Sequence, residues 1–185
     1  PEGVSIEPYL NRSELVNRNI STVVNNLIEG AVIVFLVLIL FLGNLRAGLI
    51  VASVIPLAML FAFIMMRVFN VTANLMSLGA IDFGIVVDGS IVILEGILAH
   101  IYGKQFRGRT LTRKEMDKEV EKGASGVARS ATFAVLIILI VFFPILTLNG
   151  IEGKYFTPMA KTLVFCIIGA LILSLTYVPM MASLL

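Results

Sequence analysis

The feature that most constrains this chain is an apolar run of about thirty residues, 72–102, with acidic side chains set inside it. At about 1.5 Å per residue, a helix of this length can cross a lipid bilayer with some tilt. The carboxylates in the run are Asp82, Asp88 and Glu95. Because a charge at mid-membrane costs about 2.5 to 3.5 kcal/mol on insertion scales, these carboxylates indicate a functional role, such as transfer of a proton or a cation.

The composition favours an integral membrane protein. Of the 185 residues, 58% are hydrophobic and 14% are charged, whereas about 25% of the residues of a soluble domain are charged. The net charge of +2 is too small to indicate a nucleic-acid partner. A single cysteine, Cys166, excludes an internal disulfide and leaves the redox compartment open. The polar first residues carry no signal-peptide pattern, and we expect the chain to be a piece of a larger protein.

The hydrophobic pattern predicts an all-α, polytopic transmembrane helical bundle. We expect residues 1–21 to be extended or loop-like and residues 22–185 to form the transmembrane region. The predicted spans are 27–42, 47–67, 72–102, 127–148 and 159–185. Between the third and fourth spans, residues 103–126 are expected to form a polar loop with a short surface helix that ends at Gly123. A second short loop is expected at 149–156.

Basic residues predict the orientation of the bundle. The polar segment 103–126 contains Lys104, Arg107, Arg109, Arg113, Lys114, Lys118 and Lys122. Because basic residues concentrate on the cytoplasmic side of membrane proteins, this segment is predicted to be cytoplasmic. Alternation then places residues 43–46 on the same side, and the N-terminus, Asn70 and residues 149–155 on the outer side. The charges of the segment itself are most simply interpreted as a solvated face.

The spacing of the acids suggests what they can do together. On a continuous helix, Asp88 and Glu95 share a face and are separated by about 10.5 Å along the axis. Asp82 lies about 9 Å from Asp88 in the other direction and is rotated by about 120°, so the acids of this helix cannot form one three-ligand metal site by themselves. Asp88 is predicted to matter most. Burial favours its protonated form and a nearby cation its ionised form, so it can exchange a proton for a metal ion.

Small residues predict that the acidic helix is packed against other helices. Ala80, Gly84 and Gly89 allow close approach of neighbouring helices, which predicts that the acids point into the bundle interior. The alternative is structural: the acids pair with Arg or Lys of a neighbouring helix and hold the bundle together.

Other candidate residues have simpler interpretations. His100 is expected to be an interfacial residue and not a ligand. The methionines Met59, Met65 and Met66 could bind a soft cation, but their helical spacing favours packing. Lys161 is expected near the outer end of its span, where its ammonium group can extend to the interface. No nucleotide-binding loop, nucleophile elbow or zinc pattern is present, so nothing indicates an enzyme.

The acidic run resembles that of the heavy-metal efflux branch of the resistance-nodulation-division superfamily, and the resemblance covers nearly the whole chain. The branch pattern is roughly DFGxxVDGAxxxxEN, and here the segment reads DFGIVVDGSIVILEG. The matching positions are Asp82, Phe83, Gly84, Val87, Asp88, Gly89 and Glu95. Two positions depart from the pattern: Ser90 replaces alanine, and Gly96 replaces asparagine, which is expected to remove a polar partner and loosen the helix.

The resemblance implies a proton-driven pump of the inner membrane of a Gram-negative bacterium. Such pumps have twelve spans in two repeated halves, work as homotrimers with a periplasmic adaptor protein and an outer-membrane channel, and need no cofactor beyond the proton gradient. This chain would supply the second to sixth spans, and residues 1–21 the tail of a periplasmic domain. Asp88 would relay protons, with Asp82 and Glu95 as accompanying acids and candidate metal ligands. The missing second half would supply partners to these acids.

The resemblance also suggests the substrate. The copper and silver subgroup has methionines at the positions of Val86 and Ile93, so divalent zinc, cobalt, nickel or cadmium is expected in preference to Cu(I). One alternative is export of organic compounds, although multidrug members carry two adjacent aspartates where this chain has only Asp88. The other is a membrane scaffold without a transport role.

Overall fold

The computed structural model describes residues 12–72, 79, 81–103 and 112–184, and the regular elements within these ranges are helices. They are α1 (Arg12–Leu42), α2 (Leu45–Val68), α4 (Phe83–Ile101), α5 (Arg113–Leu146) and α6 (Gly150–Ala182). Each of the five is long and apolar enough to cross a membrane. The predicted all-α bundle of membrane-spanning helices is therefore confirmed.

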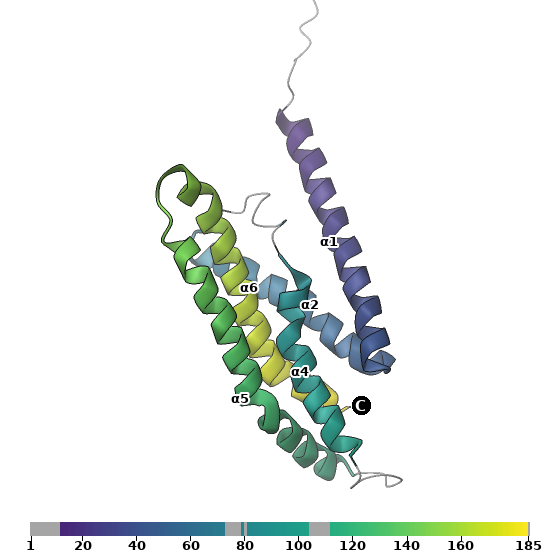
Figure 1. Ribbon diagram of the computed structural model, residues 1–185. Helices are drawn as coiled ribbons and strands as arrows, with labels where there is room; N and C mark the ends of the chain where they lie inside the picture. Colours follow the sequence, from purple (N-terminus) through teal and green to yellow (C-terminus); the bar gives the residue numbers. More distant parts are fainter. Residues whose placement is uncertain (1–11, 73–78, 80, 104–111, 185) are drawn as a thin grey trace, which may run out of the picture.

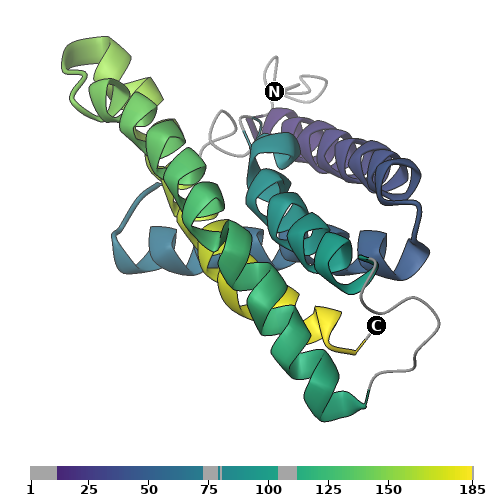
Figure 2. The same ribbon diagram turned by 60° about the horizontal axis from the view of Figure 1, so that its bottom comes forward.

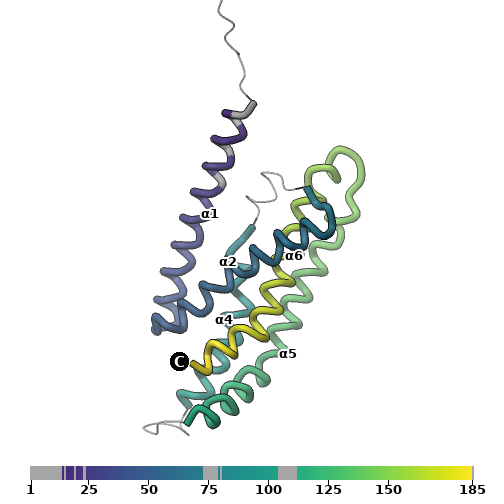
Figure 3. The backbone as a smooth tube through the Cα atoms, turned by 180° about the vertical axis from the view of Figure 1, so that it is seen from behind, coloured from purple at the N-terminus to yellow at the C-terminus, as the bar shows by residue number. Residues whose placement is uncertain are grey.

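Successive helices run in opposite directions, so the chain turns alternate between two ends of the bundle (Figure 1). Helix α6 contacts α2, α4 and α5, and α5 lies along both α4 and α6 (Figure 2). Helix α1 packs mainly against α2 and makes fewer contacts with α4. The first half of α1 lies apart from the other helices (Figure 3). The largest fully buried side chains come from α2, α4 and α6, among them Val51, Val54, Ile93, Leu94, Ile97, Ile167 and Val178.

The helix ends follow from local residues. Gly43 ends α1 in the left-handed region at φ +60°, which glycine adopts without the strain that a Cβ would add. Asn44 then caps α2, because its Oδ1 accepts hydrogen bonds from the backbone N–H groups of Arg46 and Ala47 at 3.0 and 3.5 Å. Helix α5 begins with a capping box: the Thr112 N–H and hydroxyl donate to Glu115 Oε2 at 3.0 and 2.9 Å.

Three predicted boundaries differ from the structure. Helix α1 already begins at Arg12, so the second half of the expected tail is helical, and residues 1–11 lie outside the described part. The predicted surface helix does not end at Gly123 but continues into the fourth span as α5. The expected loop 149–156 is helical from Gly150 onward. In the last two cases the glycines pack: Gly123 lies against α4, and a Cβ on Gly153 would lie 2.3 Å from the Leu148 carbonyl oxygen.

Candidate functional site

Asp82 caps α4. The predicted helix over 72–102 is not continuous: α4 starts at Phe83, and Asp82 precedes it with an extended backbone at φ −92° and ψ 112°. Its Oδ1 accepts a hydrogen bond from the Gly84 N–H at 2.9 Å, and its negative charge lies at the positive end of the helix dipole. The distance and rotation predicted between Asp82 and Asp88 assumed that both lie within one continuous helix, whereas Asp82 is the residue that caps α4. Ala80 and residues 73–78 lie outside the described residues.

Asp88 and Glu95 lie on the exposed side of α4. Together with Val92 and Ala99 they form a line of exposed residues along the helix, which we call the acidic stripe. The buried residues of α4 lie on its opposite side and are Phe83, Val86, Val87, Gly89, Ser90, Ile93, Leu94 and Ile97. The prediction that the acids point into the bundle is thus wrong for these five helices, because α2, α5 and α6 all pack against the other side.

The structural alternative, in which the acids hold the bundle together through ion pairs, has no support among the described residues. Within 12–72, 79, 81–103 and 112–184, no salt bridge involves Asp82, Asp88 or Glu95. Nor does this part of the chain contain a group of three or more His, Cys, Asp or Glu side chains that could hold a metal ion. In this arrangement the stripe leaves its two carboxylates available for partners outside these helices.

The packed side of α4 fits closely against α5 and α6. A Cβ on Gly89 would lie 3.5 Å from Ser174 Oγ on α6 and 3.6 Å from Val135 Cγ2 on α5. The neighbouring Ser90 is fully buried, and its hydroxyl has no hydrogen-bond partner among the described residues. Gly84 differs from Gly89, because a Cβ there would lie nearest to the Asp82 carboxylate, at 3.2 Å.

The last part of α4 and the first part of α5 cross at two glycines. A Cβ on Gly96 would lie 2.6 Å from Val127 Cγ2, and one on Gly123 would lie 2.8 Å from the Ile97 Cα. Neither distance is compatible with a side chain, so both glycines are needed for this close crossing. The sequence predicts that Gly96 loosens the helix. In the structure this glycine instead permits the tight contact between α4 and α5.

Next to the glycine crossing, a carboxylate accepts hydrogen bonds from two elements. His100 Nε2 donates to Glu119 Oε2 at 2.7 Å, and Lys122 Nζ donates to Glu119 Oε1 at 2.8 Å. The bond from Lys122, and then that from His100, hold the pKa of Glu119 below its ordinary value. Sequence reasoning missed Glu119 by treating its segment as solvated. The available signal was its position four residues before Gly123, on the same face of α5.

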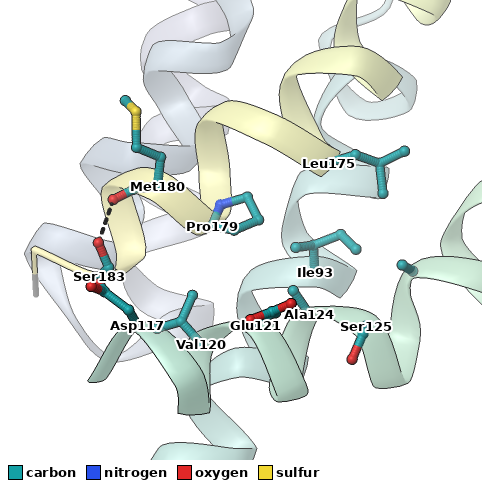
Figure 4. A pocket seen from close by; sticks show the side chains of 11 residues that line it. Ile93, Asp117, Val120, Glu121, Ala124, Ser125, Leu175, Pro179, Met180 and Ser183 are labelled. Carbon is teal, nitrogen blue, oxygen red and sulfur yellow. Dashed lines mark hydrogen bonds between the residues drawn. The ribbon is translucent and has the colours of Figure 1, made fainter. Parts of the chain in front are cut away.

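Two cavities are lined by acidic side chains of α5 or by Asp82. A groove of about 490 Å³ separates the first half of α5 from the end of α6, and the side chains of Asp117, Glu121, Met180 and Ser183 line it (Figure 4). A second cavity of about 340 Å³ lies between α1 and the start of α4, where Asn26 and Asp82 border it. Asp82 therefore borders one of these two cavities, whereas Asp88 and Glu95 line neither.

The other candidate residues are the methionines of α2, Lys161 and Cys166. Met66 is buried and accepts a hydrogen bond from Thr162 Oγ1 at 3.5 Å, so it has a packing role, and Met59 and Met65 are partly buried. Lys161 is exposed in the first half of α6 and borders a cavity with Lys154. Cys166 is buried between α6 and its neighbours.

The family model for the AcrB/AcrD/AcrF family matches residues 1–185. The cobalt-zinc-cadmium resistance protein CzcA of Cupriavidus metallidurans is 51% identical over 180 residues, which are 97% of this chain and 17% of that protein. The nickel and cobalt resistance protein CnrA of the same organism is 47% identical over 99% of this chain and 17% of its own length.

A more distant relative and a solved structure agree with these matches. The cation efflux system protein CusA of Escherichia coli is 34% identical over 98% of this chain and 18% of its own length. The crystal structure of a heavy metal efflux pump superposes with a TM-score of 0.81 at 42% identity, over 97% of this chain and 17% of that one. The chain thus spans about one sixth of the length of these relatives.

Proposed function

Because this chain belongs to the AcrB/AcrD/AcrF family of the resistance-nodulation-division superfamily, we propose that it is part of a secondary active transporter that exports divalent heavy-metal cations in exchange for protons. The observation that carries the proposal is the acidic stripe. It sets Asp88 and Glu95 on one side of a membrane-spanning helix, without an ion-pair partner in the described part of the chain. Ionisable groups in membrane spans commonly mark proton and ion pathways.

The exposure of the stripe is compatible with this role in a longer protein. Carboxylates facing lipid would cost about 2.5 to 3.5 kcal/mol each on insertion scales, so the stripe is expected to be covered by protein or to border water. The relatives are about six times longer than this chain, which leaves ample sequence to cover it. In the proposed cycle, Asp88 binds a proton from the outer side and releases it toward the cytoplasm as the substrate cation moves outward. Glu95 accompanies it one helical heptad nearer the cytoplasm.

The substrate class follows from the relatives and from the side chains. The two relatives named for cobalt, zinc, cadmium or nickel resistance are 51% and 47% identical, compared with 34% for the cation efflux system protein CusA. Val86 and Ile93, the positions where thioether ligands would suit Cu(I), are apolar and buried. These observations favour zinc, cobalt, nickel or cadmium, bound as substrate and not as a resident cofactor.

The proposal includes the cellular setting of the whole protein. We place it in the inner membrane of a Gram-negative bacterium, as a multi-pass protein that forms homotrimers and works with a periplasmic adaptor and an outer-membrane channel. Five helices that can span a membrane, and the match to an efflux pump structure, support this setting.

A resistance assay with the full-length protein tests the proposal. Cells that depend on the pump would express wild type, Asp88→Asn or Asp117→Asn, and growth would be measured against zinc, cobalt, nickel, cadmium and copper. Asp117 is an exposed carboxylate of α5 outside the stripe, so its variant is a matched control. We expect resistance to one or more divalent metals in wild type and control, and its loss in Asp88→Asn with the trimer intact. Loss of the trimer would instead support a scaffold, and protection only against organic compounds would support a multidrug exporter.

A further inference from the structure

The shortest side-chain hydrogen bond between helices in the described residues lies at the end of α4, which we propose faces the cytoplasm. Both carboxylate oxygens of Glu119 accept hydrogen bonds, one from His100 on α4 and the other from Lys122 on α5. The Glu119 side chain is only 14% exposed, whereas the Lys122 side chain is 64% exposed. We call the contact between His100 and Glu119 the α4–α5 tie.

The tie differs from an ordinary surface ion pair. Exposed pairs contribute about 0 to 1 kcal/mol, because water screens them and their long side chains lose freedom. Here the acceptor is largely covered and is bound from both sides. One helical turn away, Gly96 and Gly123 bring the two backbones so close that even a Cβ would not fit. Close packing and a hydrogen bond, one helical turn apart, therefore both hold α4 against α5.

A fixed end matters for the acidic stripe because a helix transmits rotation. His100 lies five residues beyond Glu95 and twelve beyond Asp88, which is about 7.5 Å and 18 Å along the axis. Turning α4 by about 20° would move a side-chain tip that lies about 5 to 6 Å from the axis by about 2 Å. Misplacement by about 1 Å can cost a hundredfold in a reaction that depends on geometry, so the rotation of α4 is a quantity that the protein must control.

We propose that His100 and Glu119 are positioning residues: through the α4–α5 tie they set the rotation of α4, and so the direction in which Asp88 and Glu95 point. This inference rests on the proposed function. It also assigns a role to the first part of α5, whose charges otherwise look like a solvated surface. Glu119 and Gly123 lie one turn apart on the side of α5 that faces α4, which makes the polar and the close-packed contacts one unit.

The test uses the full-length pump in proteoliposomes with an imposed proton gradient and Zn²⁺ as the probe. The variants are Glu119→Gln, His100→Ala and the exchange of both residues, His100→Glu with Glu119→His. Glu121→Gln is the control, because it removes an exposed carboxylate two residues further along α5. Each variant is measured for its initial Zn²⁺ transport rate and for amide hydrogen exchange of residues 96–102.

We expect each single variant to reduce the Zn²⁺ transport rate about tenfold and to speed amide exchange at the end of α4, because a charge-assisted hydrogen bond is lost. The exchanged pair restores both quantities to within about threefold of wild type, since it rebuilds the same link, and Glu121→Gln changes neither. Wild-type transport in the single variants, or an exchanged pair as slow as they are, would overturn the inference. Absence of proton-dependent transport of Zn²⁺, Co²⁺, Ni²⁺ and Cd²⁺ alike by wild type would instead refute the proposed function, and the amide exchange data would still decide whether the tie holds α4.

Discussion

The two sides of α4 differ in what they contact and in what they can tolerate. One side is packed against α2, α5 and α6 and contains Gly89 and Ser90 at full burial. The other side carries Asp88 and Glu95, is exposed, and has no ion pair in the described residues. Helix α4 thus combines one side that packs closely against other helices with another side that carries exposed carboxylates.

This difference separates stability from transport. Substitutions on the packed side change the volume or the polarity of a filled interior, so they should act on folding. Substitutions on the stripe change exposed side chains that have no ion pair in the described residues, so they should act on transport and leave the bundle intact. Measurements of stability and of transport on matched variants test this division.

The largest effect on stability is expected at the glycine crossing. In Gly123→Ala the added methyl group would lie 2.8 Å from the Ile97 Cα, a backbone atom that cannot move aside easily. We expect a loss of about 1 to 3 kcal/mol in the free energy of unfolding. Gly126→Ala is the control, because a Cβ there meets no atom within 4 Å, and it should stabilise the helix by up to about 1 kcal/mol. Unfolding in detergent measures the free energy of unfolding of both variants. Equal changes in Gly123→Ala and Gly126→Ala would show that α4 and α5 are not tightly packed at this crossing.

Removal of the Ser90 hydroxyl should have a smaller effect of opposite sign. This group is fully buried and has no partner among the described residues, so wild type leaves its hydrogen-bonding capacity unused. We expect Ser90→Ala to be neutral or stabilising by up to about 1 kcal/mol, with the methyl-sized side chain filling the same space. A loss of more than 1 kcal/mol, measured in the same way, would mean that Ser90 has a partner outside the described part of the chain.

On the stripe, Asp88→Asn should change the stability of this five-helix chain by less than about 0.5 kcal/mol, as is usual for exposed positions without partners. The substitution keeps the size of the side chain, and α2, α5 and α6 lie on the far side of α4. Thermal unfolding of the isolated chain in detergent provides the measurement. A shift as large as that of Gly123→Ala would contradict the division between the two sides.

The smallest effect concerns pH and the α4–α5 tie. Since the pKa of Glu119 is held below its ordinary value of 4.5, its hydrogen bonds stabilise the fold above pH 4.5, and this contribution disappears as the pH falls through the lower pKa of the folded state. The difference in melting temperature between wild type and Glu119→Gln should therefore shrink from pH 5 downward. Glu121→Gln should show no such trend. A difference that stays constant down to pH 3 would show that the charge of Glu119 plays no part.

Much of this architecture could be predicted from periodicity and length. Apolar runs long enough to cross a membrane, separated by Gly43 and by the polar segment 103–126, predict the helices and their alternation. The spacing of seven between Asp88 and Glu95 predicts their shared face. Family resemblance added the superfamily, which the comparisons confirm.

The failures have a common physical cause. Gly96 and Gly123 look like breaks in a helix when only propensity is considered, but a glycine inside a helix can also allow a close contact with another helix, as both do here. Which of the two applies depends on tertiary contacts that local sequence does not contain. The same holds for Asp82, whose role as a cap depends on where α4 starts, and for the direction of Asp88, which depends on where the other helices pack.

Simultaneous measurement of proton and Zn²⁺ fluxes tests the central claim most directly. The full-length pump and its Asp88→Asn variant would be reconstituted in vesicles with a pH-sensitive dye and a zinc-sensitive dye inside. The account predicts Zn²⁺ movement coupled to opposite proton movement in wild type, and a loss of both by about a hundredfold or more in Asp88→Asn. Coupled fluxes of equal size in the two proteins would contradict it.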